Sequence, residues 1–176
     1  QREIVTDTDS YLTGLRASLR QAPDVILLGE MRDHETISTA MTAAETGHLI
    51  LSTLHTIGAA NTIDRVIDAF PPGQQQQIRT QLSMVLDAVI SQQLIPTLDG
   101  GVQPAFEVMF LNNAIRNMIR ESKIHQIDGV IATSQGEGMI SMDNSIISLY
   151  RKGAISRENA IAYSSNSELM AKKLDR

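Results

Sequence analysis

The stretch Pro23–Asp33, PDVILLGEMRD, decides the fold of this chain. Four consecutive aliphatic residues, Val25–Leu28, lie between a proline and a glycine, which predicts a short buried strand. Glu30 then stands at the carboxyl end of that strand. In α/β proteins that handle phosphates, an acid at this edge can reach a magnesium ion or an attacking water. Glu30 is therefore a candidate catalytic residue. For this segment taken alone, pairing with Arg32 or capping of the next helix would explain it equally well.

A helix and a second strand are expected directly after Glu30. Asp33 is a suitable N-cap, and Gly47 is typical of the position just beyond a helix. The apolar run Leu49–Leu54 then predicts another strand. Strand, helix and strand in this order favour a parallel sheet with helical crossovers.

The two histidines that flank the second strand cannot bind one metal ion. Seven extended steps of about 3.3 Å place His48 and His55 roughly 23 Å apart and on opposite faces. His55 is expected at the same edge as Glu30, whereas His48 enters at the other edge. A histidine at a strand end is commonly a hydrogen-bonded loop residue, so the shared edge with Glu30 is what makes His55 a candidate.

The rest of the chain predicts helices around one hairpin. Before the first strand, Asp7–Arg20 is expected to be a helix that carries Arg16 and Arg20 one turn apart. After the second strand, we expect helices over Ala59–Phe70 and Gln74–Gln93, an antiparallel pair of strands over Leu94–Leu98 and Val102–Leu111, and short helices opened by Asn112 or Asn113, Ser122, Ser141, Ser156 and Asn166.

Composition excludes several classes of site. The chain of 176 residues has no cysteine, so disulfides, thiolate zinc sites and cysteine nucleophiles are absent. No apolar run approaches about 18 residues, which leads us to expect no transmembrane segment and a cytosolic location. The net charge is −5 and the basic residues are scattered, which argues against a nucleic-acid partner.

A phosphate-binding P-loop is missing from the sequence. Such a loop ends in Gly-Lys-Ser/Thr, and none of the four lysines follows a glycine. Because the chain also begins at Gln1 and not at a methionine, we expect it to be a fragment or a processed product.

Four ordered segments resemble the type II/IV secretion ATPase superfamily, and most closely its pilus-retraction branch, the motors of twitching motility. DVILLGEMRD resembles the Walker B segment, and TGHLILSTLHT resembles the His box. AIRNMIRESKIHQ resembles the retraction signature, with Met118 where leucine is usual and Ser122 where glycine is usual. GMISMDNSIISLYRKGAIS resembles the tail that follows it. The resemblance covers essentially the whole chain.

The resemblance implies roles for individual residues. Glu30 would orient the attacking water and support Mg²⁺ through water, without direct metal ligands in the chain. His48 and His55 would be the two box histidines, with His55 the better candidate for sensing the γ-phosphate. Arg16, Arg20 and Arg32 are candidates for compensating phosphate charge, and Gly29, Glu30 and His55 would contribute to nucleotide binding. The retraction-signature helix comprises Ala114, Ile115, Arg116, Asn117, Ile119, Arg120 and Glu121.

The resemblance also implies the architecture. Residues 1–111 would form part of an α/β RecA-like P-loop ATPase core, with parallel strands, helical crossovers and an antiparallel hairpin, and residues 112–176 an all-helical C-terminal subdomain. The Walker A loop, the Asp box and a PAS-like domain would lie upstream of Gln1. The full-length protein would be a homo-hexamer that uses ATP and Mg²⁺ and acts on a pilus inner-membrane platform protein, at the cytoplasmic face of that membrane. Without the P-loop, this chain alone is expected to be inactive.

Three other functions are considered. The extension or type II secretion branch of the superfamily commonly carries a tetracysteine zinc insertion, so the absence of cysteine favours retraction. A non-catalytic fragment could instead present the helix with Arg116 and Arg120 to a partner. A nucleic-acid motor would need a basic or aromatic surface, and the sequence shows none.

Overall fold

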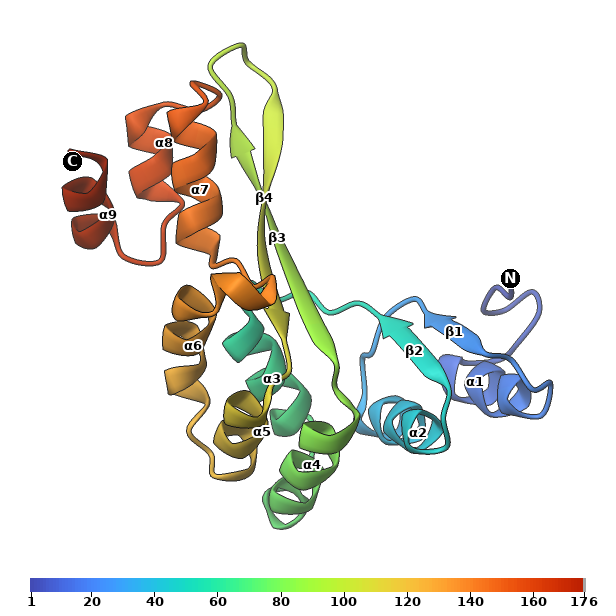
Figure 1. Ribbon diagram of the computed structural model, residues 1–176. Coiled ribbons are helices and arrows are strands. Elements are labelled where there is room, and N and C mark those ends of the chain that lie inside the picture. Colours follow the sequence, from blue (N-terminus) through green and yellow to red (C-terminus); the bar gives the residue numbers. More distant parts are fainter. Residues whose placement is uncertain (176) are drawn as a thin grey trace. The chain divides into compact units, whose positions relative to one another are not determined.

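The computed structural model describes residues 1–175, which fall into two compact units (Figure 1). The first unit contains residues 1–55 and 64–86. The second contains residues 56–63 and the chain from Asp87 onward. The helix α3 (Ala59–Asp68) therefore begins in the second unit and ends in the first.

A parallel strand pair forms the centre of the first unit. β1 (Val25–Leu28) pairs with β2 (Leu49–Ser52), and the register runs from Val25↔Leu49 to Leu28↔Ser52. Parallel strands need a crossover, and α2 (His34–Glu45) provides it. α1 (Tyr11–Leu19) precedes the pair, and its Leu15 packs with Ile26, Leu28 and Ala40 in a buried cluster.

The ends of α2 follow from its capping residues. The Asp33 side chain accepts a hydrogen bond of 2.8 Å from the backbone N–H of Thr36, which is the predicted N-cap. This N–H also holds the pKa of Asp33 below its ordinary value. At the other end, Gly47 adopts a φ of +96°, the left-handed conformation that glycine allows at low cost. Both capping predictions are confirmed.

The strand pair is buried on one face only, which corrects the expectation of a fully buried strand. Ile26 and Leu28 are buried, but the side chains that alternate with them are open to solvent. On this open face, Val25 is 52% exposed, Leu27 73%, Leu49 50% and Leu51 48%. A run of aliphatic residues does not by itself show how many faces of a strand are covered.

A long antiparallel hairpin organises the second unit. β3 (Ala88–Pro96) and β4 (Val102–Phe110) pair over nine residues each, from Ala88↔Phe110 to Pro96↔Val102. The helix α7 (Met142–Arg151) packs along β4, as Figure 1 shows. Ile95 and Ala105 of the hairpin and Ile146 of α7 share one buried cluster.

The predicted helix over Gln74–Gln93 is wrong in its second half. The helix α4 (Pro72–Val85) ends at Val85, and residues from Ala88 onward belong to β3. Val89 keeps a helical spacing from Val85, so the apolar pattern fitted both structures. The strand forms because its backbone groups pair with β4, a partner distant in sequence.

The remaining helices match the predicted short pieces. Asn112, Ser141, Ser156 and Asn166 each accept a hydrogen bond at the N-terminus of a helix, as expected. In chain order the elements are α5 (Asn113–Arg120), the 3₁₀ turn Ile124–Gln126, α6 (Ile127–Thr133), the 3₁₀ turn Gln135–Glu137, α7, α8 (Arg157–Ala162) and α9 (Ser167–Leu174).

Ser122 is not the N-cap that the sequence suggested. It lies just after α5 with a φ of +59°, and its N–H donates to the carbonyl of Ile119. The N–H of Lys123 donates to the carbonyl of Met118 at 2.8 Å. These two bonds form a Schellman motif, in which the residue in this position is usually glycine. The serine therefore occupies a left-handed position that strains a side chain with a Cβ atom.

The hairpin lies in the second compact unit together with α7. The assignment of residues 1–111 to an ATPase core and 112–176 to a helical subdomain stays a prediction. Among residues 1–175, no helix has both the length and the apolar character needed to cross a bilayer.

The two faces of β3 are expected to differ in their contribution to stability. Ile95 is completely buried, so Ile95→Ala should lower the free energy of unfolding by about 2–5 kcal/mol. Ile90 lies on the opposite face of the same strand and is 67% exposed, so Ile90→Ala should cost under about 1 kcal/mol. Urea unfolding of both variants measures the difference. Equal losses would contradict the observed orientation of the hairpin.

Relief of the left-handed conformation at Ser122 is expected to stabilise the chain. Ser122→Gly should raise the free energy of unfolding by about 0.5–1 kcal/mol. The strain that a Cβ atom causes in the left-handed conformation is larger than the entropy that glycine adds to the unfolded chain. Ser122→Ala is the matched control, since alanine keeps the Cβ and should bring no gain. Thermal unfolding of the three proteins checks this, and a gain for alanine would contradict it.

Candidate active site

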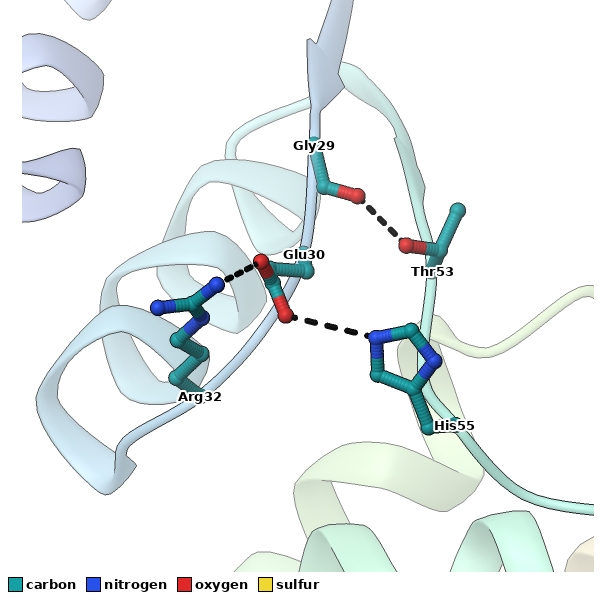
Figure 2. A network of polar contacts seen from close by, with 5 residues as sticks. All are labelled: Gly29, Glu30, Arg32, Thr53 and His55. Carbon is teal, nitrogen blue, oxygen red and sulfur yellow. Dashed lines mark hydrogen bonds and ion pairs between the residues drawn. The ribbon is translucent and has the colours of Figure 1, made fainter. Parts of the chain in front are cut away.

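Glu30 and His55 come together because β1 and β2 run parallel. Glu30 follows β1 after Gly29, and His55 follows β2 after a short extended segment (Figure 2). Two hydrogen bonds continue the pairing beyond the strands: the Thr53 hydroxyl donates to the Gly29 carbonyl, and the Met31 N–H donates to the Thr53 carbonyl at 3.2 Å. These bonds hold the two segments side by side at the edge where both candidates were expected.

The Glu30 carboxylate has a partner on each oxygen. Oε1 accepts a hydrogen bond from the Arg32 guanidinium, and Oε2 lies 3.5 Å from Nε2 of His55. Figure 2 shows the two side chains approaching from opposite sides. The side chains are 20% exposed for Glu30, 68% for Arg32 and 91% for His55, so the cluster is open to solvent. The pairing with Arg32 considered above is present, whereas Asp33 and not Glu30 caps α2.

The electrostatics keep Glu30 ionised. The hydrogen bond from Arg32 holds the pKa of Glu30 below its ordinary value, and the nearby His55 acts in the same direction. A carboxylate with a lowered pKa is a weak proton acceptor. It can still accept a hydrogen bond from a water or balance the charge of a hydrated cation. The arrangement therefore suits orienting a water more than removing its proton.

A small cavity lies beside this cluster. It measures about 170 Å³, and its lining includes the two arginines Arg32 and Arg65 together with Asp33 and His34. Ligand pockets for drug-sized molecules measure roughly 300–1,000 Å³, so this cavity is large enough for a phosphate group or a few waters but not for a nucleotide. Arg65 was not among the sequence candidates, because its position on α3 indicated only an exposed face.

The structure does not bring the other candidates of the first unit to Glu30. His48 lies at the end of α2, where Nδ1 is 3.1 Å from the carbonyl oxygen of Ala43 and 3.2 Å from the hydroxyl of Thr46. Arg16 and Arg20 lie on and just after α1, and within residues 1–175 no ion pair joins either to Glu30. The same part of the chain contains no group of three potential metal ligands.

The retraction-signature residues form α5 in the second unit. Ile115 and Ile119 are completely buried, so they belong to the packing of the unit. Arg116 lies 3.7 Å from Asp87, and Glu121 pairs with Lys123 at 2.6 Å. The Arg120 guanidinium donates to the side-chain oxygen of Asn117, and Ala114 is exposed.

Two further polar residues were missed from the sequence. Thr53 joins the ends of the two strands, as described above. Glu107 is 7% exposed and hydrogen-bonds the first residues of two helices. An acid within the apolar strand VQPAFEVMF was the available signal for Glu107, since a buried carboxylate requires partners.

Removal of the Arg32 guanidinium should raise the pKa of Glu30 toward its ordinary value of 4.5. Above pH 4.5, the ionised Glu30 side chain makes the native chain more stable relative to the unfolded chain. This contribution to the free energy of unfolding is lost as the pH falls through the lowered pKa of Glu30. Arg32→Gln should remove this contribution, whereas Arg16→Gln is the control without a contact to Glu30. A carbon-13 NMR titration of the Glu30 carboxyl measures the change. An unaltered pKa in Arg32→Gln would contradict the pairing.

Comparison with known proteins identifies the family. Residues 7–163 match the model of the family described as "Type II/IV secretion system protein". The chain is 52% identical to a "Twitching motility protein" of Neisseria gonorrhoeae, over 97% of the chain and 46% of that protein. It is 51% identical to the "Type IV pilus retractation ATPase PilT" of Pseudomonas aeruginosa, over 91% of the chain and 46% of that protein. The chain thus spans about half the length of these relatives.

A solved structure has the same fold. The crystal structure of the pilus retraction motor PilT with bound ADP superposes with a TM-score of 0.87 at 45% identity, over 96% of this chain and 48% of that one. The expected fold class is therefore confirmed: an α/β, partial RecA-like core with a parallel strand pair and an antiparallel hairpin, followed by helices. By the match over most of its length, the chain belongs to the type II/IV secretion system protein family.

Proposed function

We propose that this chain is the carboxy-terminal part of a hexameric motor ATPase that couples ATP hydrolysis to type IV pilus retraction, the process behind twitching motility. The observation that carries the proposal is the pairing of Glu30 with His55 at the carboxyl edge of two parallel strands. Identities of 52% and 51% to a twitching motility protein and to a retraction ATPase support the retraction branch.

In the proposed reaction each residue of the cluster has a distinct task. Glu30 orients the attacking water and supports hydrated Mg²⁺, which fits its ionised state. His55 reaches the γ-phosphate through its exposed ring, and Arg32 compensates phosphate charge. When bound, ATP with Mg²⁺ supplies the phosphoryl group that is transferred.

The three candidate arginines differ in whether they contact Glu30. Arg32 contacts Glu30 directly, so it is the first candidate for a role within one subunit. Arg16 on α1 and Arg20 just after it are both exposed and remain candidates for contacts across a subunit interface. His48 is proposed as the second box histidine, at the opposite edge of β2.

The remaining parts of the proposal concern the whole protein. It would assemble as a homo-hexamer, bind at the cytoplasmic face of the inner membrane and act on the pilus platform protein there. We propose that this polypeptide alone is inactive, because the P-loop sequence that would hold the phosphates is not in it. For the isolated chain, a non-catalytic interaction fragment is the second candidate. The extension or type II secretion branch is the alternative for the whole protein.

A chimera allows the function to be tested with the residues of this chain. The chain replaces the corresponding 172 residues of the Neisseria gonorrhoeae twitching motility protein, to which it is 52% identical. The chimera should hydrolyse ATP, and Glu30→Gln should lower kcat by about 10²–10⁴-fold while ATP remains bound, because the amide cannot orient water as the carboxylate does. Glu35→Gln, an exposed acid of α2, is the matched control.

Two results would overturn parts of the proposal. Undiminished turnover by the Glu30→Gln chimera would remove Glu30 from the reaction. Measurable ATP hydrolysis by this polypeptide alone, abolished by Glu30→Gln, would overturn the proposal that the isolated chain is inactive.

A further inference from the structure

The first residue of α1 lies beside the end of β1, within the first unit. A Cβ atom placed on Gly29 would lie 3.7 Å from the hydroxyl oxygen of Tyr11 and 3.8 Å from its Cε1. Within residues 1–175, no other atom outside Leu28–Glu30 comes within 4 Å of that position. Both distances are ordinary van der Waals separations. The far edge of the tyrosine ring therefore covers the open side of Gly29, the residue directly before Glu30.

The ring of Tyr11 is fixed at its other end by α1. Ser10 caps this helix, since its side chain accepts a hydrogen bond of 3.1 Å from the backbone N–H of Thr13. Tyr11 is half-buried and packs against the cluster of Leu15, Ile26, Leu28 and Ala40. The core thus holds the base of the side chain, while its tip reaches Gly29.

The segment that carries Glu30 is hydrogen-bonded to the extension of β2. The Thr53 hydroxyl donates to the Gly29 carbonyl, and the Met31 N–H donates to the Thr53 carbonyl at 3.2 Å. These two bonds come directly before and directly after Glu30 in the chain. Hydrogen bonds to one neighbour fix the register of such a segment, whereas its orientation also requires packing by a second neighbour. The contact of Tyr11 with Gly29 supplies that packing.

Tyr11 also lies close to Arg32, the hydrogen-bond partner of Glu30. The hydrogen bond with Glu30 and the charge of Glu30 raise the pKa of Arg32, and Tyr11 acts in the same direction. A phenol has this effect only in its ionised form and at short range. The tip of the ring therefore lies near both residues that flank Glu30 on its way out of the strand. All of these residues belong to the first unit.

We propose that Tyr11 is a positioning residue for Glu30. By covering Gly29, its ring fixes the backbone from which Glu30 projects and keeps the carboxylate within reach of Arg32. The inference rests on the proposed function, in which Glu30 orients the attacking water. Tyr11 itself touches no reacting atom and acts only through the segment Gly29–Arg32.

The first test uses the chain alone. Tyr11→Leu keeps an apolar side chain against the cluster but removes the Cε1 and hydroxyl that reach Gly29. In a carbon-13 NMR titration, the pKa of Glu30 should rise toward its ordinary value of 4.5, because a looser segment weakens the hydrogen bond from Arg32. Hydrogen exchange of the Met31 amide should become about tenfold faster. Tyr11→Phe restores Cε1 and should return both quantities to those of the parent chain.

Leu19 provides the matched control. It packs against the same cluster from the last residue of α1, about 12 Å along the helix from Tyr11. Leu19→Ala should lower the free energy of unfolding but leave the pKa of Glu30 and the exchange of Met31 unchanged. If Tyr11 only supported the core, the variants at the two positions would behave alike.

The second test measures catalysis in the chimera described above. Tyr11→Leu should lower kcat about tenfold and leave KM for ATP within about twofold, because Glu30 is misplaced while the nucleotide still binds. Tyr11→Phe and Leu19→Ala should both keep the kcat of the parent chimera.

The outcomes separate this inference from the proposed function. An inactive parent chimera would refute the proposed function, whereas the pKa and exchange measurements would still test the positioning of Glu30 in the chain alone. An unchanged pKa of Glu30 in Tyr11→Leu, or equal changes in Leu19→Ala, would overturn the inference. If Tyr11→Leu does not fold, the parent chain decides. The absence of nuclear Overhauser effects between the Tyr11 ring and the α-protons of Gly29 would then overturn the inference as well.

Discussion

The parallel register of β1 with β2 is the constraint on which the candidate site depends. Because Val25 pairs with Leu49 and Leu28 with Ser52, the carboxyl ends of both strands meet at one edge. The segments that leave this edge carry Glu30 and His55. An antiparallel pairing of the same two strands would send His55 to the opposite edge. The crossover helix α2 and the bonds of Thr53 keep this arrangement, so the chemistry of the cluster follows from the direction of two short strands.

The Glu30–Arg32 pair shows how a structural contact and a functional role can coexist. An exposed ion pair of this kind contributes little to stability, so its exchange for another partner costs little. In the proposed reaction, a phosphate group could draw the guanidinium away and leave the carboxylate to a water. The neighbouring cavity, lined by Arg32 and Arg65, presents two guanidinium groups to such an anion.

The sequence predicts those features that depend on a few neighbouring residues. The bounds of β1, the N-cap Asp33, the left-handed Gly47 and the turn of the hairpin each follow from local chemistry. The meeting of Glu30 with His55 was also predictable, since strand, helix and strand imply parallel pairing. The start of β3 at Ala88 was not, because pairing with a distant strand overrode a helical spacing. The contacts of Glu107 required knowledge that α3 and α7 begin beside the same strand.

The position of His48 restricts the protonation of its ring. A carbonyl oxygen can only accept a hydrogen bond, and the Thr46 hydroxyl already donates to the Ala43 carbonyl, so both contacts of Nδ1 are satisfied when Nδ1 carries the hydrogen. The neutral ring is therefore held as the Nδ1–H tautomer, which leaves the lone pair on Nε2. Any partner of Nε2 in neutral His48 must then be a hydrogen-bond donor, such as an amide, a hydroxyl or a cationic side chain. The backbone and hydroxyl groups at the end of α2 thus make Nε2 of neutral His48 a hydrogen-bond acceptor.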